Sequence, residues 1–243
     1  MKTRTKIFFI LLIAVLISTI LVLPYVLEAQ GELLKNSPVS MPILILVAII
    51  QAVVVLGIAT LLGVILAEKT GFKIPVLTAW IEKKKIKYKR ILLISVIWGV
   101  IAGILILVLD ILVFKQIVVI NASWWQGLLA SFYGGIAEEV LMRLFLVSLF
   151  VFIFMKVFRK KIANPVMIWV SIIIVSVLFG LGHLPITSAL VSITPIVIIR
   201  AIVLNGVGGI IFGWLYWKKG LEAAMISHFS ADIVLHVLAP LIL

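Results

Sequence analysis

The amino-acid sequence predicts an all-α, polytopic membrane protein, and three observations carry this prediction. Of the 243 residues, 65% are apolar and 12% are charged, whereas soluble domains contain about 45–50% apolar and about 25% charged residues. The mean hydropathy is +1.38. Apolar runs of the length that a spanning helix needs, about 20 residues, fill nearly the whole chain. We therefore expect a single integral-membrane domain over residues 1–243.

The charged residues predict how the chain lies in the membrane. The net charge of +12 comes from short basic loops beside the apolar runs, which is the positive-inside signature. It predicts a multi-pass protein of the cell membrane with a cytoplasmic N-terminus, for which the lipid bilayer is a partner and nucleic acid is not. The chain has no cysteine, which excludes disulfides, thiolate catalysis and cysteine-ligated metal.

Apolar runs mark the expected spans at residues 7–27, 42–67, 91–114, 123–158, 163–182, 188–216 and 221–241. The first run is longer than the core of a cleaved signal peptide, about 7–15 residues, so we expect a retained helix. The basic stretch 68–90 is expected to fix topology, with Trp80 at the interface. Pro195, Arg200 and residues 205–209 predict that the sixth run forms two short or tilted helices. That gives about eight spans, with seven as the alternative, and leaves the side of the C-terminus open.

The fourth run carries charges that a spanning helix tolerates poorly. Glu138, Glu139 and Arg143 each cost about 2.5–3.5 kcal/mol at the centre of a span. Glu139 and Arg143 are four residues apart with the acid first, the favourable order for an ion pair. Glu138 is turned by about 100° from Glu139 in an α-helix. We expect Arg143 to neutralise and orient Glu139, while Glu138 faces a cavity as a general base. An ion pair that only locks helices together is the alternative.

Two later runs carry further polar groups. His183 ends the fifth run, and His228, Asp232 and His236 form one stripe on the last run at positions i, i+4 and i+8. The simpler interpretations are an interfacial histidine and a packing network, and His236 in particular is expected to pack behind the site. Together with Glu138, however, His183, His228 and Asp232 form a candidate catalytic set.

In chain order these residues resemble the three motifs of the CPBP intramembrane proteases. That family includes the CAAX-prenyl endopeptidases and bacterial proteins linked to bacteriocin processing and self-immunity. The resemblance covers about residues 123–239 and rests on Glu138-Glu139-x-x-x-Arg143, Phe179-x-x-x-His183 and His228-x-x-x-Asp232. It implies helices around a polar intramembrane cavity, in which the protease hydrolyses a peptide or membrane-associated protein substrate.

The resemblance also implies roles for individual residues. Glu138, assisted by His183, would activate a water molecule, and His228 with Asp232 would support the oxyanion or a metal. The prenyl-protein branch has Asn where this chain has Asp232. An ionised aspartate repels an oxyanion, so Asp232 would be protonated, would orient His228 or would bind metal. Glu138, His183 and His228 could ligate zinc as in a metalloprotease, but the His-Glu-x-x-His spacing is missing, and metal-free glutamate chemistry stays open beside it.

Two other functions fit the same residues. A non-catalytic membrane protein, such as a bacteriocin-immunity protein, would use the cavity to bind a partner without hydrolysis. A proton-coupled transporter would use acids and histidines within its spans and an interrupted helix near residues 205–209. No inverted repeat of the kind found in many carriers is visible in the sequence.

Overall fold

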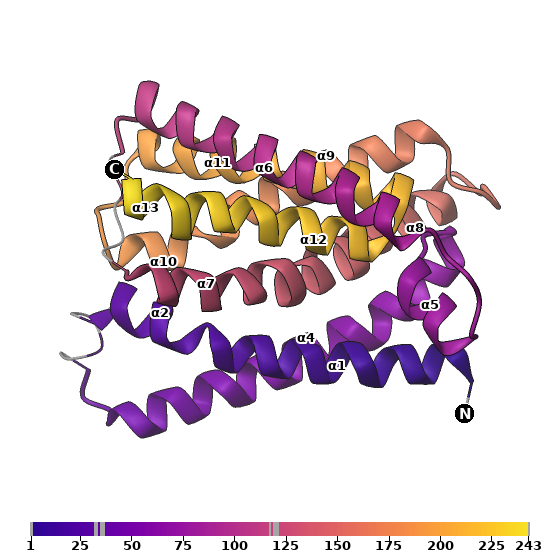
Figure 1. The fold of residues 1–243 in the computed structure, drawn as a ribbon, viewed down its shortest axis with the longest axis horizontal. Helices are drawn as coiled ribbons and strands as arrows, with labels where there is room; N and C mark the ends of the chain where they lie inside the picture. Colours follow the sequence, from indigo (N-terminus) through magenta and orange to yellow (C-terminus); the bar gives the residue numbers. More distant parts are fainter. Residues whose placement is uncertain (1, 32–33, 35–36, 117, 119–121, 243) are drawn as a thin grey trace.

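A computed structural model describes the chain except residues 1, 32–33, 35–36, 117, 119–121 and 243. Throughout the described residues the regular structure is helical, and the helices run side by side along one long axis (Figure 1). The N- and C-termini lie at opposite ends of that axis (Figure 1). The prediction of an all-α, polytopic membrane protein is confirmed.

Seven segments of the described chain are long and apolar enough to cross a membrane: Thr3–Ala29, Met41–Thr70, Tyr88–Leu112, Trp124–Val157, Pro165–Ser188, Pro195–Lys219 and Leu221–Ile242. Seven is the smaller of the two span numbers that the sequence left open. An odd number of crossings fits the positions of the two termini in Figure 1.

The first three spans contain α1 (Thr3–Leu21), α2 (Leu23–Ala29), α4 (Met41–Thr70) and α6 (Tyr88–Leu112), and the short helix α5 (Pro75–Ile81) follows α4. The fourth span consists of α7 (Trp124–Tyr133), η1 (Gly134–Glu138), η2 (Val140–Val147) and α8 (Ser148–Val157). The remaining elements are α9 (Pro165–Gly182), α10 (Leu184–Ser188), α11 (Pro195–Lys219), α12 (Leu221–Asp232), η3 (Ile233–Leu238) and α13 (Ala239–Ile242). The three segments labelled η are π-helical.

The sixth span is one continuous helix, so the prediction of two short helices within residues 188–216 was wrong. Pro195 occupies the first turn of α11, where the missing N–H of proline does no harm. A Cβ added at Gly209 would lie 2.7 Å from the Ser176 Cβ on α9. Glycine therefore allows α9 and α11 to approach closely and does not break the helix.

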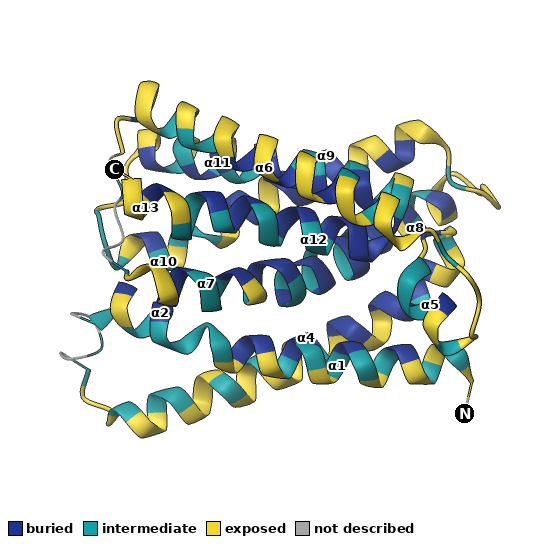
Figure 2. Ribbon diagram, in the orientation of Figure 1, coloured by how far each residue is buried: buried dark blue, intermediate teal, exposed yellow. Residues whose placement is uncertain are grey.

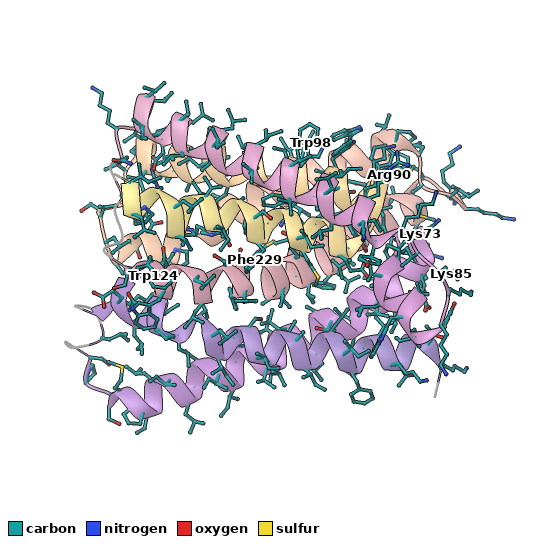
Figure 3. The ribbon with its side chains drawn as sticks, in the orientation of Figure 1. Lys73, Lys85, Arg90, Trp98, Trp124 and Phe229 are labelled. Carbon is teal, nitrogen blue, oxygen red and sulfur yellow. The ribbon has the colours of Figure 1, made fainter. Side chains whose placement is uncertain are left out.

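Most lysines and arginines outside the spans lie at the end of the bundle that holds the N-terminus. Figure 3 shows Lys73, Lys85 and Arg90 there and Trp124 at the opposite end. Because α11 crosses once, Lys218 at its end joins the same basic end. This distribution agrees with a positive-inside arrangement, and the cytoplasmic location of the basic end stays a prediction.

Burial separates the core of the bundle from its lipid-facing helices. Figure 2 shows continuous buried faces on α7, α11 and α12, whereas α6 and the first half of α4 are largely exposed. The exposed side chains on those two helices are apolar, for example Ile43, Leu46 and Leu93, and apolar side chains are stable against lipid. The polar residues predicted as functional belong to the buried elements.

Candidate active site

Two glycines bring the fourth span against α12. A Cβ added at Gly134 would collide with the Asp232 carboxylate and would lie 3.2 Å from His228 Nε2. A Cβ at Gly135 would lie 3.0 Å from the Met225 carbonyl oxygen on the same helix. Residues with side chains would hold the two helices apart, so this glycine pair sets the distance between Glu138 and the polar face of α12.

The fourth span leaves α-helical geometry at the predicted site. It is π-helical from Gly134 to Glu138 and again from Val140 to Val147, and a third π-segment, η3, begins directly after Asp232. π-Turns are rare and are frequent at functional sites. The expectation of 100° per residue therefore does not hold here, yet the adjacent acids still differ in their exposure. The Glu138 side chain is 22% exposed and the Glu139 side chain is 0% exposed.

Glu139 is the centre of a buried polar network. Its Oε1 lies 3.1 Å from Arg143 Nη1 and 2.8 Å from His228 Nδ1. Because a carboxylate accepts, His228 donates through Nδ1, and this bond fixes both the tautomer and the orientation of the ring. Arg143 is only 1% exposed and also donates through Nη2 to the Gly209 carbonyl oxygen at 3.4 Å. Glu139 thus links α12 to α11 through Arg143.

Aromatic rings hold the same groups from two sides. Phe212 stacks on His228, with the ring centroids 4.6 Å apart and an angle of 22°, and the Phe179 ring meets His228 edge-on at 5.7 Å. The Arg143 guanidinium lies 5.1 Å from the Phe179 centroid and 5.4 Å from that of Phe212, within cation–π range. Phe179 belongs to a predicted motif, whereas Phe212 was missed, since nothing in the apolar run of α11 distinguishes it.

The second nitrogen of His228 points toward two further acids. His228 Nε2 lies 3.8 Å from Glu138 Oε2 and 3.6 Å from Asp232 Oδ1. The structure therefore gathers Glu138, His228 and Asp232 around one ring nitrogen, although these residues are up to 94 positions apart in the chain. The arrangement can hold and pass protons between Nε2 and the carboxylates.

His183 lies beside this cluster and not within it. Its Nδ1 is 2.8 Å from the Phe179 carbonyl oxygen, and its ring packs edge-on against the Phe179 ring at 4.8 Å. The carbonyl can only accept, so Nδ1 carries the hydrogen and Nε2 of the neutral ring is free to accept. Phe179 contacts both imidazoles, and among the described residues no carboxylate lies within ion-pair distance of His183.

The predicted zinc ligands do not form a ligand set. Within the part of the chain that the structure describes, no group of three or more His, Asp or Glu side chains is arranged to hold a metal ion. His228 Nδ1 is bonded to Glu139 and His183 Nδ1 to a backbone carbonyl, bonds that metal-bound histidines also make, so Nε2 of both rings stays available. In this arrangement Glu138, His183 and His228 are not gathered into a tetrahedral zinc site.

His236 lies behind the site, next to the first span. Its Nδ1 is 3.4 Å from the Tyr25 hydroxyl, and the two rings meet edge-on at 5.5 Å. Gln126 on α7 donates to the Pro24 carbonyl oxygen at 3.1 Å. Through these contacts α2 packs against α7 and η3. Neither Tyr25 nor Gln126 stood out in the sequence, because their partners lie more than 100 residues away.

The comparison with protein families agrees with this region. Residues 119–234 match the family described as Type II CAAX prenyl endopeptidase Rce1-like, and the match contains Glu138, His183, His228 and Asp232. No curated protein matches the chain, and no solved structure matches it. The family supports a CAAX-type endopeptidase activity in a multi-pass membrane protein, and its description lends no support to bacteriocin immunity. Residues 119–234 are thus similar to the CPBP family of CAAX-type intramembrane proteases.

Proposed function

We propose that this protein is a metal-independent intramembrane endopeptidase in which Glu138 activates the attacking water. The observation that carries the proposal is the difference between the adjacent acids. Glu139 is fully buried and committed to Arg143 and His228, whereas Glu138 is 22% exposed and lies 3.8 Å from His228 Nε2. Of the two adjacent acids, the exposure supports Glu138 as the one that meets water and a substrate.

In the proposed reaction Glu138 takes a proton from water as the water oxygen attacks the carbonyl carbon of the scissile peptide bond. The free Nε2 of His183 assists by accepting a hydrogen bond from the same water. The carbonyl oxygen becomes the oxyanion of a tetrahedral intermediate. Glu138 then gives its proton to the leaving nitrogen as the C–N bond breaks, which restores the carboxylate.

His228 is the proposed oxyanion donor. Its Nδ1–H is held by Glu139, so a protonated ring presents its Nε2–H on the side of Glu138 and Asp232. A preorganised donor stabilises charge that develops in the transition state, and loss of one such donor costs about 10²–10³ in rate. Asp232, 3.6 Å from Nε2, is proposed to keep the proton on His228, a role that an aspartate fills without donating to the oxyanion itself.

The proposed substrate is a peptide segment or lipid-associated protein tail that enters from the bilayer. We further propose that the protein lies in the cell membrane with its basic end in the cytoplasm, since Lys73, Lys85 and the other loop cations gather at that end. The presence of Asp232 in place of the asparagine of the prenyl-protein branch leaves the prenyl group of the substrate unassigned.

The test is cleavage of a fluorogenic peptide library, which includes CAAX-type peptides, by purified protein in proteoliposomes. Glu138→Gln keeps the size of the side chain but cannot accept the proton, so turnover should fall by about 10²–10⁴ with no change in the midpoint of thermal unfolding. Glu28→Gln, which changes an exposed acid outside the cluster, is the matched control and should keep full activity. Wild-type turnover in Glu138→Gln would refute the proposed base.

A further inference from the structure

A cavity of about 470 Å³ lies at the basic end of the bundle, between α1, the end of α4 and α5. None of the proposed catalytic residues lines it. Its inner wall is apolar and includes the buried side chains Ile7, Val64, Phe72 and Ile74. Its rim is charged and carries the cations Arg4, Lys73, Lys84 and Lys85.

The rim has more cations than its own acids neutralise. Arg4 pairs with Glu68 at 3.3 Å, and Lys84 pairs with Glu82 at 2.7 Å. The hydrogen bond from Lys84 also lowers the pKa of Glu82, which keeps this acid ionised and matched. Lys73 and Lys85 make no ion pair with any residue that the structure describes. Figure 3 shows both of them at the end that holds the N-terminus.

A second cavity, of about 790 Å³, continues from the first along the outside of the bundle. The two share Ala79 and Lys84 in their walls. The second is lined by apolar side chains that include Phe9, Ile10 and Trp80, and by Lys6, Lys83 and Lys84. Trp80 is 70% exposed, and exposed tryptophan is typical of the membrane–water interface. A polar, cationic hollow thus opens into an apolar one at the depth where phospholipid headgroups lie.

We propose that the two cavities bind one anionic phospholipid, with its phosphate at Lys73 and Lys85 and an acyl chain beside Phe9, Ile10 and Trp80. Basic pockets between spanning helices are suited to such headgroups. An anionic amphiphile matches both the unpaired cations of the first cavity and the apolar wall of the second. A soluble anion matches only the first.

The proposed lipid site is also connected to the helix that carries His228. The Lys73 carbonyl oxygen accepts from Leu221 N at 3.0 Å, and the buried Glu222 carboxylate accepts from Leu77 N at 2.9 Å. Both contacts fasten the segment around α5 to the first turn of α12. A lipid that orders this segment therefore stabilises the position of α12, and that effect does not depend on peptide hydrolysis.

The experiment uses the full chain in a neutral detergent. Phosphatidylglycerol, phosphatidylcholine or inorganic phosphate is added, and the midpoint of thermal unfolding is measured together with retained lipid by native mass spectrometry. Phosphatidylglycerol should raise the midpoint of the wild type, and the other two should not. In Lys73→Gln/Lys85→Gln the apparent Kd for phosphatidylglycerol should rise at least tenfold. Both lysines are exposed, so the substitutions should not disturb folding, and Lys85→Glu alone provides a second variant.

Lys160→Gln/Lys161→Gln is the matched control, because it removes the same charge from exposed positions of another basic loop. It should bind phosphatidylglycerol as the wild type does. Equal weakening in this control would show general electrostatic attraction and overturn the site. An equal shift with inorganic phosphate would overturn the assignment to a lipid, as would the lack of any shift with phosphatidylglycerol.

Discussion

Besides the exposed Arg4–Glu68 pair, the described spanning segments contain two more deeply placed arginine–carboxylate pairs, and these two are built differently. Arg200 on α11 holds Asp110 on α6 through two hydrogen bonds of 2.7 and 2.6 Å, and both side chains are 15% exposed. Arg143 lies 3.1 Å from Glu139 in the same span, both are almost completely buried, and the Nη1 of Arg143 makes no aligned hydrogen bond.

The difference distinguishes an ion pair that only joins two helices from an ion pair that positions the residues of the candidate site. The Asp110–Arg200 pair is bidentate, so each group satisfies most of the other's hydrogen-bonding capacity. Glu139 divides its interactions between Arg143 and His228. An intramembrane ion pair is thus a poor indicator of function by itself. The group that shares the carboxylate, here an imidazole facing a partly exposed acid, is the better indicator.

Loss of the arginine should separate the two pairs most strongly. Arg143→Met removes the cation beside the buried Glu139 carboxylate and leaves His228 as its remaining partner. Breaking a buried ion pair costs about 3–5 kcal/mol, and peptide cleavage should disappear. Arg200→Met leaves Asp110 near a helix end, where side chains reach the polar interface. The free energy of unfolding should therefore fall by less in Arg200→Met than in Arg143→Met. Chemical unfolding in detergent measures both, and a larger loss for Arg200→Met would reverse the comparison.

Exchange of the two charges should give the second largest difference. The double variant Asp110→Arg/Arg200→Asp restores an ion pair between the same two helices, and the two side chains have few other partners. Its cleavage activity should therefore be close to that of the wild type. Glu139→Arg combined with Arg143→Glu places a guanidinium against His228 Nδ1, so the ring loses its acceptor. Misplacement of a catalytic group by about 1 Å already costs about 10²-fold. Cleavage per folded molecule is the readout, and recovery in the second exchange would show that Glu139 does not orient His228.

The sequence predicts those features of the fold and the site that depend on residue spacing within one span. The apolar runs match the observed spans, with the largest differences at the end of the fifth run and the start of the sixth. The match results because the backbone must satisfy its own hydrogen bonds in lipid, which produces helices of known length. The ion pair of Glu139 with Arg143 follows from i,i+4 spacing. The order of the three motifs was enough to select Glu138, His228 and Asp232, which the structure gathers, although their catalytic roles stay predictions.

The misses depend on partners that are distant in the chain. Arg200 was expected to mark a break in its helix, since nothing in the sequence shows its partner Asp110, 90 positions away. The glycines of α11 and the pair at Gly134 serve close packing, which cannot be told from helix breaking without the neighbouring helix. The π-turns are likewise not visible in residue spacing, and neither is the stacking of Phe212 on His228.

A methyl group at Gly134 should disturb the site without touching either ion pair directly. The added carbon of Gly134→Ala meets the Asp232 carboxylate and comes within 3.2 Å of His228 Nε2. Overpacking of this kind costs about 1–3 kcal/mol, and cleavage should fall by a larger factor than stability explains. Gly206→Ala is the control, because its added carbon meets no atom within 4 Å beyond its chain neighbours and its own helix backbone. Equal activity of the two variants would show that close approach at Gly134 is not required.

The smallest effect should come from Tyr25→Phe, which tests whether the frame of the site extends into the first span. The hydroxyl lies 3.4 Å from His236 Nδ1, a long hydrogen bond, and loss of a typical one costs about 0.5–1.5 kcal/mol. The edge-on ring contact stays, so unfolding should shift by no more than that amount and cleavage should change less than threefold. Tyr88→Phe, at an exposed position, controls for loss of a hydroxyl. A much larger loss of cleavage in Tyr25→Phe would place His236 and the first span within the catalytic apparatus, because packing alone does not need the hydroxyl.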